Sequence, residues 1–271
     1  MKSGRTRAAL LVVSLLLYFF LYAPIAAVVA QSFNSARHGS AWGGFTTKWY
    51  ASVAHNELAL RATGVTLLLA AMSTAVSTVL GTLLALGLNR GKLAGQRAAE
   101  WTLRTVIVVP DIVMAIALLM FYGVVRQWLG VLEPGLLTMT LAHITFQIPF
   151  VALVVRARLN GIDPSLAEAA IDLGATGWQT FRHITCPLIS PGILAGALLA
   201  FTLSLDDFVL SFFTTGPGAT TLPILIYSSV KRGLTPDINA LSTLLAVLLV
   251  AVTVVVMLLQ GRSSDHRAQK G

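Results

Sequence analysis

Three aspartates stand within long apolar stretches of this 271-residue chain: Asp111, Asp206 and Asp207. A carboxylate at the centre of a lipid-exposed helix costs about 2.5–3.5 kcal/mol on insertion scales, so acids in membrane segments usually face a cavity or a partner. As fixed negative charges, these acids could pair with a cationic substrate on its way through a membrane. The alternative is a structural role, in which each acid caps a neighbouring helix or pairs with a basic group.

Asp206 and Asp207 are neighbours in the sequence, and neighbouring positions of a helix point about 100° apart. The two therefore cannot face one path equally, and we expect at least one of them to contact the substrate. Asp111 follows Pro110 and is expected near the opposite side of the membrane. The three acids then mark a path rather than a single pocket.

Other polar residues also lie in or beside the apolar segments. His143 and Gln147 share one face of a helix at i, i+4, and we expect them to make hydrogen bonds between helices. Trp49, within Lys48-Trp49-Tyr50, is expected in the aromatic belt at the membrane surface.

Residue patterns typical of catalytic sites are absent from the sequence. The phosphate-binding pattern G-x-x-x-x-G-K-[ST] does not occur, so ATP would have to be bound by another chain. H-E-x-x-H and zinc-ligand spacings do not occur either. Cys186 is the single cysteine, which excludes an intrachain disulfide and a cysteine-based metal cluster. We therefore predict that the chain is not an enzyme and binds no metal or cofactor of its own.

The composition is that of a membrane protein. Apolar residues make up 56% of the chain and charged residues 11%, and the mean hydropathy is +0.79, whereas a soluble domain carries about 25% charged residues. Long uncharged runs alternate with short polar stretches, which is typical of several membrane crossings. The net charge of +8 comes from basic residues between the apolar runs, so we expect membrane lipid and no nucleic acid as a partner.

A helix that crosses a hydrocarbon core of about 30 Å needs roughly 20 mostly apolar residues. Six segments meet this requirement: Ala8–Ala30, Ala62–Leu88, Val106–Val125, Leu136–Val155, Leu188–Phe213 and Asn239–Leu259. We therefore predict an all-α membrane protein with six transmembrane helices, in a single domain over residues 1–271. The first segment could instead be a signal peptide, but its apolar run exceeds the roughly 7–15 residues of one, which favours an uncleaved helix.

The basic residues predict the orientation of the six spans. With both termini in the cytoplasm, about two thirds of the 19 Lys and Arg residues lie on the cytoplasmic side. The others lie in the outer connections: Arg37, Lys48, Arg61, Arg126, Lys231 and Arg232. Because basic residues concentrate in cytoplasmic loops, both ends of the chain are predicted to be cytoplasmic.

Small residues recur at every fourth position in two of the predicted spans. They are Ser73, Ser77, Gly81 and Ala85 in the second and Gly192 and Gly196 in the fifth. Such stripes let helix backbones approach closely. We expect them to serve packing within one bundle rather than a dimer interface.

The polar connection 156–187 predicts two short amphipathic helices. Asp163, followed by a proline, would start the first helix as its N-cap, and Gly174 would end it. Between them, one apolar stripe has helical spacing: Leu166, Ala169, Ala170 and Leu173. This ridge would either pack on the chain's own bundle or fit a groove on another protein.

The second short helix is predicted from its capping residues. Thr176-x-x-Gln179 is typical of a capping box at a helix start, and Pro187 would stop the helix. Residues 156–187 would then form a hairpin, bent at Gly174, on the cytoplasmic side of the membrane.

This connection resembles the EAA loop of ABC-importer permeases. The matching residues are Glu168, Ala169, Ala170, Gly174, Ile184 and Pro187. Cys186 departs from the family pattern, which usually has leucine there, and we expect a tolerated apolar exchange. The resemblance implies the type I ABC-importer permease fold, with 156–187 as a cytoplasmic loop whose coupling helix docks into an ATPase subunit. The coupling residues that it implies are Leu166, Glu168, Ala169, Ala170, Leu173 and Gly174.

Three further segments resemble the polyamine branch of this family, the spermidine and putrescine permeases. They are 204–208 (Ser-Leu-Asp-Asp-Phe), 216–223 (Gly-Pro-Gly-Ala-Thr-Thr-Leu-Pro) and 236–241 (Pro-Asp-Ile-Asn-Ala-Leu), and they look most like a putrescine-importer permease. Permeases for ferric iron, phosphonate and thiamine are related, so these substrates stay open as alternatives.

The resemblance also implies partners and a location. The chain would work in a bacterial inner membrane with a second, homologous permease, two copies of an ATPase subunit that hold ATP and magnesium, and a periplasmic substrate-binding protein. It would carry polyamines into the cytoplasm by alternating access, past Asp206, Asp207, Asp111 and Trp49. For Trp49 the resemblance adds an alternative to the aromatic belt, a place at the entrance where its ring face would attract an ammonium group. The residues alone also allow a self-sufficient secondary transporter, although no internal repeat supports it.

Overall fold

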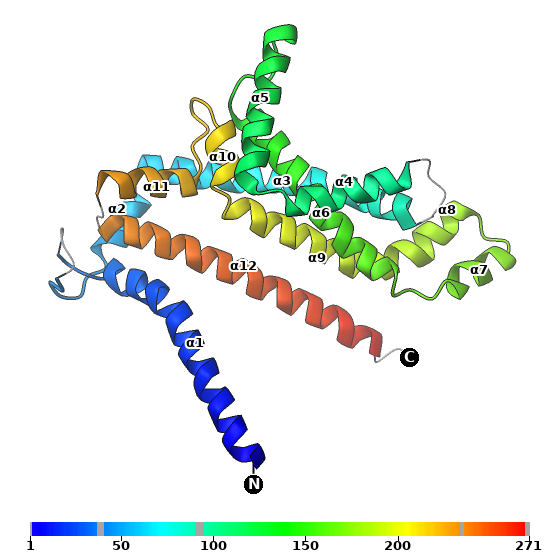
Figure 1. Ribbon diagram of the computed structural model, residues 1–271, viewed down its shortest axis with the longest axis horizontal. Helices are drawn as coiled ribbons and strands as arrows, with labels where there is room; N and C mark the ends of the chain where they lie inside the picture. The colour runs from blue at the N-terminus through cyan, green and yellow to red at the C-terminus, as the bar shows by residue number, and fades with distance from the viewer. Residues whose placement is uncertain (1, 37–40, 90–94, 234–235, 269–271) are drawn as a thin grey trace. The chain divides into compact units, whose positions relative to one another are not determined.

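The computed structural model of the chain describes residues 2–36, 41–89, 95–233 and 236–268. Over these ranges the chain is mainly helical, and the β-structure found there is one isolated bridge, between Asn34 and Phe45 (Figure 1). The helices are α1 (Lys2–Ser32), α2 (Lys48–Ala54), α3 (Glu57–Asn89), α4 (Gln96–Val108), α5 (Asp111–Leu129), α6 (Leu136–Leu159), α7 (Ser165–Asp172), α8 (Gly177–Thr180), the π-helical η1 (Phe181–Thr185), α9 (Cys186–Leu205), α10 (Val209–Thr214), α11 (Leu222–Arg232) and α12 (Pro236–Ala268).

Six helical segments among the described residues are long and apolar enough to cross a membrane. They are Leu10–Ser32, Glu57–Asn89, Asp111–Leu129, Leu136–Leu159, Gly177–Leu205 and Pro236–Val254. Each overlaps one of the six segments predicted from hydropathy, so the prediction of an all-α protein with six spans is confirmed. Two of the predicted spans nevertheless have the wrong bounds.

The third span was predicted to start at Val106, but the helix is interrupted there. α4 ends at Val108, and Val109 has an extended backbone (φ −65°, ψ 130°) directly before Pro110, which precedes α5. The ring of a proline disfavours helical geometry at the residue before it, so Pro110 separates the two helices instead of kinking one. Asp111 becomes the first residue of α5.

The fifth span was predicted to run from Leu188 to Phe213, and both of its ends are wrong. Its helix already starts at Gly177, because α8, η1 and α9 follow one another without a gap. Pro187 therefore does not stop the second short helix. In η1 the N–H of Cys186 bonds to the carbonyl of Phe181, and this wider turn accommodates the proline that follows. At the other end, α9 stops at Leu205 and α10 begins only at Val209.

Contacts divide the chain into two units, residues 1–60 with 225–248 and residues 61–224 with 249–271, and each is described by itself. In the second unit α6 and α9 lie side by side, and α7 and α8 lie at the end where α6 finishes and α9 starts (Figure 1). α10 packs against α5 and α6.

Glycines bring the helices of the second unit close together. A Cβ on Gly81 would lie 2.7 Å from the Cβ of Val151, and one on Gly196 would lie 3.2 Å from its Cγ1. A Cβ on Gly192 would lie 2.7 Å from the Cβ of Arg158. α3 and α9 therefore both press against α6, which confirms that the small-residue stripes serve packing within this bundle.

In the first unit, Asn34 organises the connection between α1 and α2. Its amide donates to the carbonyl of Ala41 (2.8 Å), and its Oδ1 accepts from the backbone N–H groups of Ala36 and Gly43 (3.1 and 2.8 Å). Asn34 is 1% exposed, so these bonds fix the connection by satisfying a buried amide.

Candidate functional site

The break between α9 and α10 holds the two adjacent aspartates. The carboxylate of Asp207 accepts hydrogen bonds from the backbone N–H groups of Leu210 (3.2 Å) and Ser211 (2.8 Å), at the start of α10. These N–H groups have no partner within the helix, so Asp207 acts as a cap. Asp206 is exposed, and its carboxylate makes no hydrogen bond or ion pair with another residue of the described part of the chain.

The carboxylate of Asp207 also faces a buried histidine. Its Oδ2 lies 3.3 Å from Nε2 of His143, and the side chains are 11% and 1% exposed, respectively. The same Nε2 lies 3.1 Å from Oγ of Ser211, and Nδ1 lies 2.8 Å from Oγ of Ser204. His143 thus joins α6 to α9, to α10 and to the break between them. Asp206 and Asp207 point in different directions, since only Asp207 is turned inward, but they lie in a break between two helices and not on one continuous helix as predicted.

Gln147 lies one turn from His143 and is buried as well, with 1% of its surface exposed. Its amide donates to Ser73 Oγ (3.2 Å) and to the carbonyl of Ala200 (3.1 Å), and its Oε1 accepts from Ser77 Oγ (2.8 Å). Interhelical hydrogen bonds were predicted for His143 and Gln147, and both predictions are confirmed.

Asp111 is an exposed residue in the first turn of α5, where a negative charge interacts favourably with the helix dipole. The described hydrogen bonds and ion pairs do not connect it with Asp206 or Asp207. The structure therefore brings two of the three predicted acids together and leaves Asp111 at the start of another helix. A contact between any of them and a substrate stays a prediction.

Trp49 belongs to the first unit, where its side chain contacts two other groups of the chain. Its indole N–H donates to the carbonyl of Asn34 (2.7 Å), and the ammonium of Lys48 lies 4.5 Å from the centre of its ring. A cation of the chain itself thus already lies over the ring that was considered for a substrate cation. The proposed substrate contact of Trp49 remains untested.

The elbow between α6 and α9 has the predicted glycine and capping box, but α7 begins at Ser165 with Pro164, and not Asp163, as its N-cap. The backbone N–H of Ser165 donates to the carboxylate of Asp163 (3.0 Å), which lowers the pKa of Asp163. Gly174 has the left-handed φ of +87° after α7. Thr176 and Gln179 exchange the two bonds of a capping box: Thr176 N–H to Gln179 Oε1 (2.7 Å) and Gln179 N–H to Thr176 Oγ1 (3.3 Å).

The predicted apolar ridge of α7 is divided between the inside and the outside. Ala170 is buried, with 7% of its surface exposed, so it packs within the unit. Leu166, Ala169 and Leu173 are exposed, and Leu173 reaches 88%. Glu168 is also exposed and lies in the first turn of α7. The surface that a partner could reach is therefore narrower than the sequence predicts.

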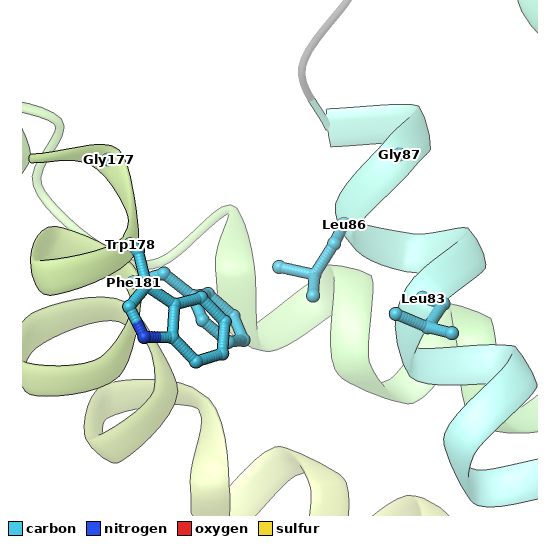
Figure 2. Close-up of a pocket in the computed structure, with 6 residues that line it drawn as sticks. All are labelled: Leu83, Leu86, Gly87, Gly177, Trp178 and Phe181. Carbon is cyan, nitrogen blue, oxygen red and sulfur yellow. The ribbon is translucent and has the colours of Figure 1, made fainter.

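An apolar groove lies beside this elbow. Figure 2 shows Leu83 and Leu86 of α3 facing Trp178 and Phe181 across an open space. The volume of this groove is about 520 Å³. Trp178 is 67% exposed, and its ring centre lies 5.6 Å from that of Phe181. Sequence reasoning did not single out these two aromatic residues, although the position of Trp178 within the capping box and of Phe181 just after it was the available signal.

α4 is tied to the neighbouring helices by polar side chains that sequence reasoning also missed. Arg156 Nη2 donates to Glu100 Oε1 (2.8 Å), and this contact lowers the pKa of the Glu100 carboxyl. Gln96 donates to the carbonyl of Leu88 at the end of α3 (3.1 Å). Leu103, also on α4, packs into the hydrophobic core of this unit.

Within the described ranges, no group of three or more His, Cys, Asp or Glu side chains could hold a metal ion. The expectation that ATP and magnesium are bound by a partner subunit stays a prediction.

Comparison with known proteins identifies the family. A sequence profile described as "Binding-protein-dependent transport system inner membrane component" matches residues 77–268, which include the elbow and both aspartates of the α9–α10 break. The chain belongs to this family. As an inner membrane component of this kind it is a multi-pass membrane protein, and its relatives are transport permease subunits rather than enzymes.

Curated relatives match over most of their length. The chain is 40% identical to the "Putrescine transport system permease protein PotI" of Escherichia coli (strain K12), over 95% of this chain and 92% of the relative. It is 44% identical to the "Spermidine/putrescine transport system permease protein PotC" of the same organism, over 86% of each chain. PotC of Haemophilus influenzae is 39% identical, over 92% of this chain and 95% of the relative. The predicted resemblance to polyamine permeases is confirmed.

Solved structures show the same fold. A bacterial ABC transporter involved in the import of alginate matches with a TM-score of 0.79 and 20% identity, over 96% of both chains. The MetNI methionine ABC transporter matches with a TM-score of 0.63 and 21% identity, over 75% of this chain and 95% of that one. This family member therefore has the fold of ABC-importer permeases.

Proposed function

We propose that this chain is one of two permease subunits of an ATP-driven importer that carries polyamines, putrescine or spermidine, into the bacterial cytoplasm. The observation that supports this most strongly is the 40% and 44% identity to permeases named for these substrates, over most of the chain. Permeases for ferric iron, phosphonate or thiamine remain the alternative within the same class, and a self-sufficient secondary transporter is disfavoured by membership of this family.

The chemistry of the acidic residues supports a polyamine as the substrate. Such a molecule carries two or more ammonium groups, and removing their water inside a membrane is costly without a counter-charge. Asp206 and Asp111 are exposed carboxylates within or directly beside membrane-spanning segments, so each can supply one. We assign the substrate path to Asp206, Asp207 and Asp111, with Trp49 as a weaker candidate at the entrance.

Transport would require partners that bind ATP and deliver the substrate. We propose a second, homologous permease, two copies of an ATPase subunit with their ATP and magnesium, and a periplasmic binding protein. ATP binding would close the ATPase pair and pull the two elbows together, which turns the permease pair from inward-open to outward-open. The elbow would dock through Leu166, Glu168, Ala169, Leu173 and Gly174, while buried Ala170 would support the ridge from behind.

The test is uptake of labelled putrescine by the complete complex reconstituted in lipid vesicles. We expect uptake that needs ATP and the binding protein and that spermidine competes for, whereas ferric ion, 2-aminoethylphosphonate and thiamine leave it unchanged. Uptake without ATP would indicate a secondary transporter. Competition by one of the three non-polyamine solutes, with no putrescine uptake, would place the chain in another branch of the family.

The orientation of the chain gives a separate prediction. Reporter domains fused at Gly95 and after Gly271 are expected to report the cytoplasm, and one inserted at Ser40 the periplasm, because most basic residues lie in the segments assigned to the inside. Ser40 and Gly271 lie outside the described residues, as do Arg37, Arg90, Lys92 and Lys270 of the charge count. A periplasmic reporter after Gly271 would contradict the six-span orientation.

A further inference from the structure

We propose that His143 is a positioning residue for the acidic end of the substrate path. Its Nε2 holds Asp207 against the start of α10, and this contact fixes the place of the neighbouring, exposed Asp206. The inference rests on the proposed polyamine transport and assigns different tasks to the two adjacent aspartates. The carboxylate of Asp207 points inward and is bound by other groups of the protein, whereas the exposed carboxylate of Asp206 contacts the amine of the substrate.

The contacts of Asp207 leave it little freedom to follow a moving ammonium group. Two backbone N–H groups of α10 and the imidazole of His143 all point at its two oxygens, at 2.8–3.3 Å. A carboxylate oxygen cannot donate, so its place 3.3 Å from Nε2 favours the tautomer with the proton on this nitrogen, which can then donate to Asp207 or to Ser211 Oγ at 3.1 Å. A carboxylate that accepts several such bonds is held in one place.

His143 in turn is held by a chain of buried hydrogen bonds. Nδ1 contacts Ser204 Oγ at 2.8 Å, and Ser204 lies 3.4 Å from Ser73 Oγ of α3. Ser73 accepts from the amide of Gln147. His143, Ser73 and Ser204 are at most 2% exposed. The break between α9 and α10 is therefore tied through polar groups to both α6 and α3, and connected polar networks of this kind restrict a buried site to one arrangement.

The two nitrogens of the imidazole can be tested separately. Glutamine reaches the position of Nε2 and keeps a donor for Asp207, whereas asparagine reaches only the position of Nδ1 and keeps the contact with Ser204. If His143 acts through Asp207, His143→Gln should retain uptake within about threefold of the wild type, while His143→Asn and His143→Leu lose about tenfold or more.

That uptake is measured with labelled putrescine in the reconstituted complex, together with complex assembly and basal ATP hydrolysis, which should survive in all three variants. A general packing role would not separate glutamine from asparagine. Equal uptake by the two variants, whether high or low, would overturn the proposal. Thr145→Val, at an exposed position of the same helix, serves as the control and should leave uptake unchanged.

A second measurement does not depend on the substrate. Cys186 is the only cysteine, so Asp206→Cys in a Cys186→Ala background gives a single thiol at the break. A charged maleimide should label this thiol at the same rate with His143 and with His143→Gln. With His143→Asn the rate should change by about threefold or more, because the break is then no longer held in one position. Unchanged rates in all variants would refute the positioning role. If labelling of this single-cysteine protein depends on His143 as expected but the wild-type complex carries no polyamine, the proposed function fails and the positioning role stands.

Discussion

Replacing Asp206 and Asp207 together by asparagine is expected to reduce polyamine uptake at least about tenfold, which corresponds to about 1.4 kcal/mol in the rate-determining barrier. Asparagine keeps the size of aspartate, so the double variant removes both charges without opening a cavity, and the single variants below separate this loss of charge from the loss of an acceptor at α10. The ammonium groups of the substrate would then cross the α9–α10 break without a counter-charge. Initial uptake rates in vesicles that contain the complete complex measure the effect.

The two single variants separate the tasks of the aspartates. Asp206→Asn should weaken uptake while the break stays intact, because this carboxylate is exposed and bonds to no other residue in the described part of the chain. Asp207→Asn should also disturb the cap of α10, since one of its two oxygens becomes an amide beside donor groups. Glu133→Gln, an exposed acid on the connection between α5 and α6, removes the same charge elsewhere and is the matched control. Wild-type kinetics in the double variant would make both aspartates structural.

Ala169→Asp is expected to uncouple transport from ATP hydrolysis. Ala169 is exposed on α7, so the substitution leaves the packing of the chain intact but places an unpaired charge in the proposed contact with the ATPase. A buried, unsatisfied polar group costs about 1–3 kcal/mol, enough to weaken this contact substantially. The measurements are uptake, ATP hydrolysis stimulated by the binding protein, and co-purification of the ATPase subunit.

The choice of alanine decides how clearly this experiment can be interpreted. Ala170 is buried, so the same change there would damage the elbow itself and could not report on docking. Ala98→Asp, at an exposed alanine of α4, is the control for an added carboxylate and should leave stimulated hydrolysis normal. If Ala169→Asp also shows normal stimulated hydrolysis and uptake, α7 does not dock through this face.

Hydropathy was sufficient to find the six spans, because each needs a run of apolar residues that other structures seldom require. It could not find where a span is interrupted, since an interruption changes the backbone and not the mean hydropathy. Pro110 was a local signal for the first interruption, because it restricts the residue before it. At the second, the aspartate that caps α10 was the signal: capping of a neighbouring helix was considered as an alternative role for the acid, but the span was still predicted to continue to Phe213.

Local capping chemistry was predicted well because it depends on residues three or four positions apart. The capping box of Thr176 and Gln179 and the left-handed Gly174 are of this kind. The expected stop at Pro187 failed because a π-turn just before it gave the chain another way to accommodate a proline.

The contacts of the candidate site could not be predicted in the same way. His143 meets Asp207 across 64 positions of sequence, and nothing in either local segment specifies the other. The sequence could predict that a polar residue on a membrane helix needs a partner. Which partner it has depends on how α6, α9 and α10 pack.

Gly192 and Gly196 allow α9 to pack closely against α6, and this close packing affects whether the two helices can move independently. Val151 and Arg158 fill spaces that a side chain on Gly196 or Gly192 would occupy, so the two helices are interlocked and cannot slide past each other without collision. The elbow is attached to the ends of both. A pull on Leu173 would thus move α6 and α9 as one lever, whose far end, about 30 Å along α9, carries Asp206. The elbow and the α9–α10 break would then lie at opposite ends of one rigid part, so that a movement of the elbow also moves the break.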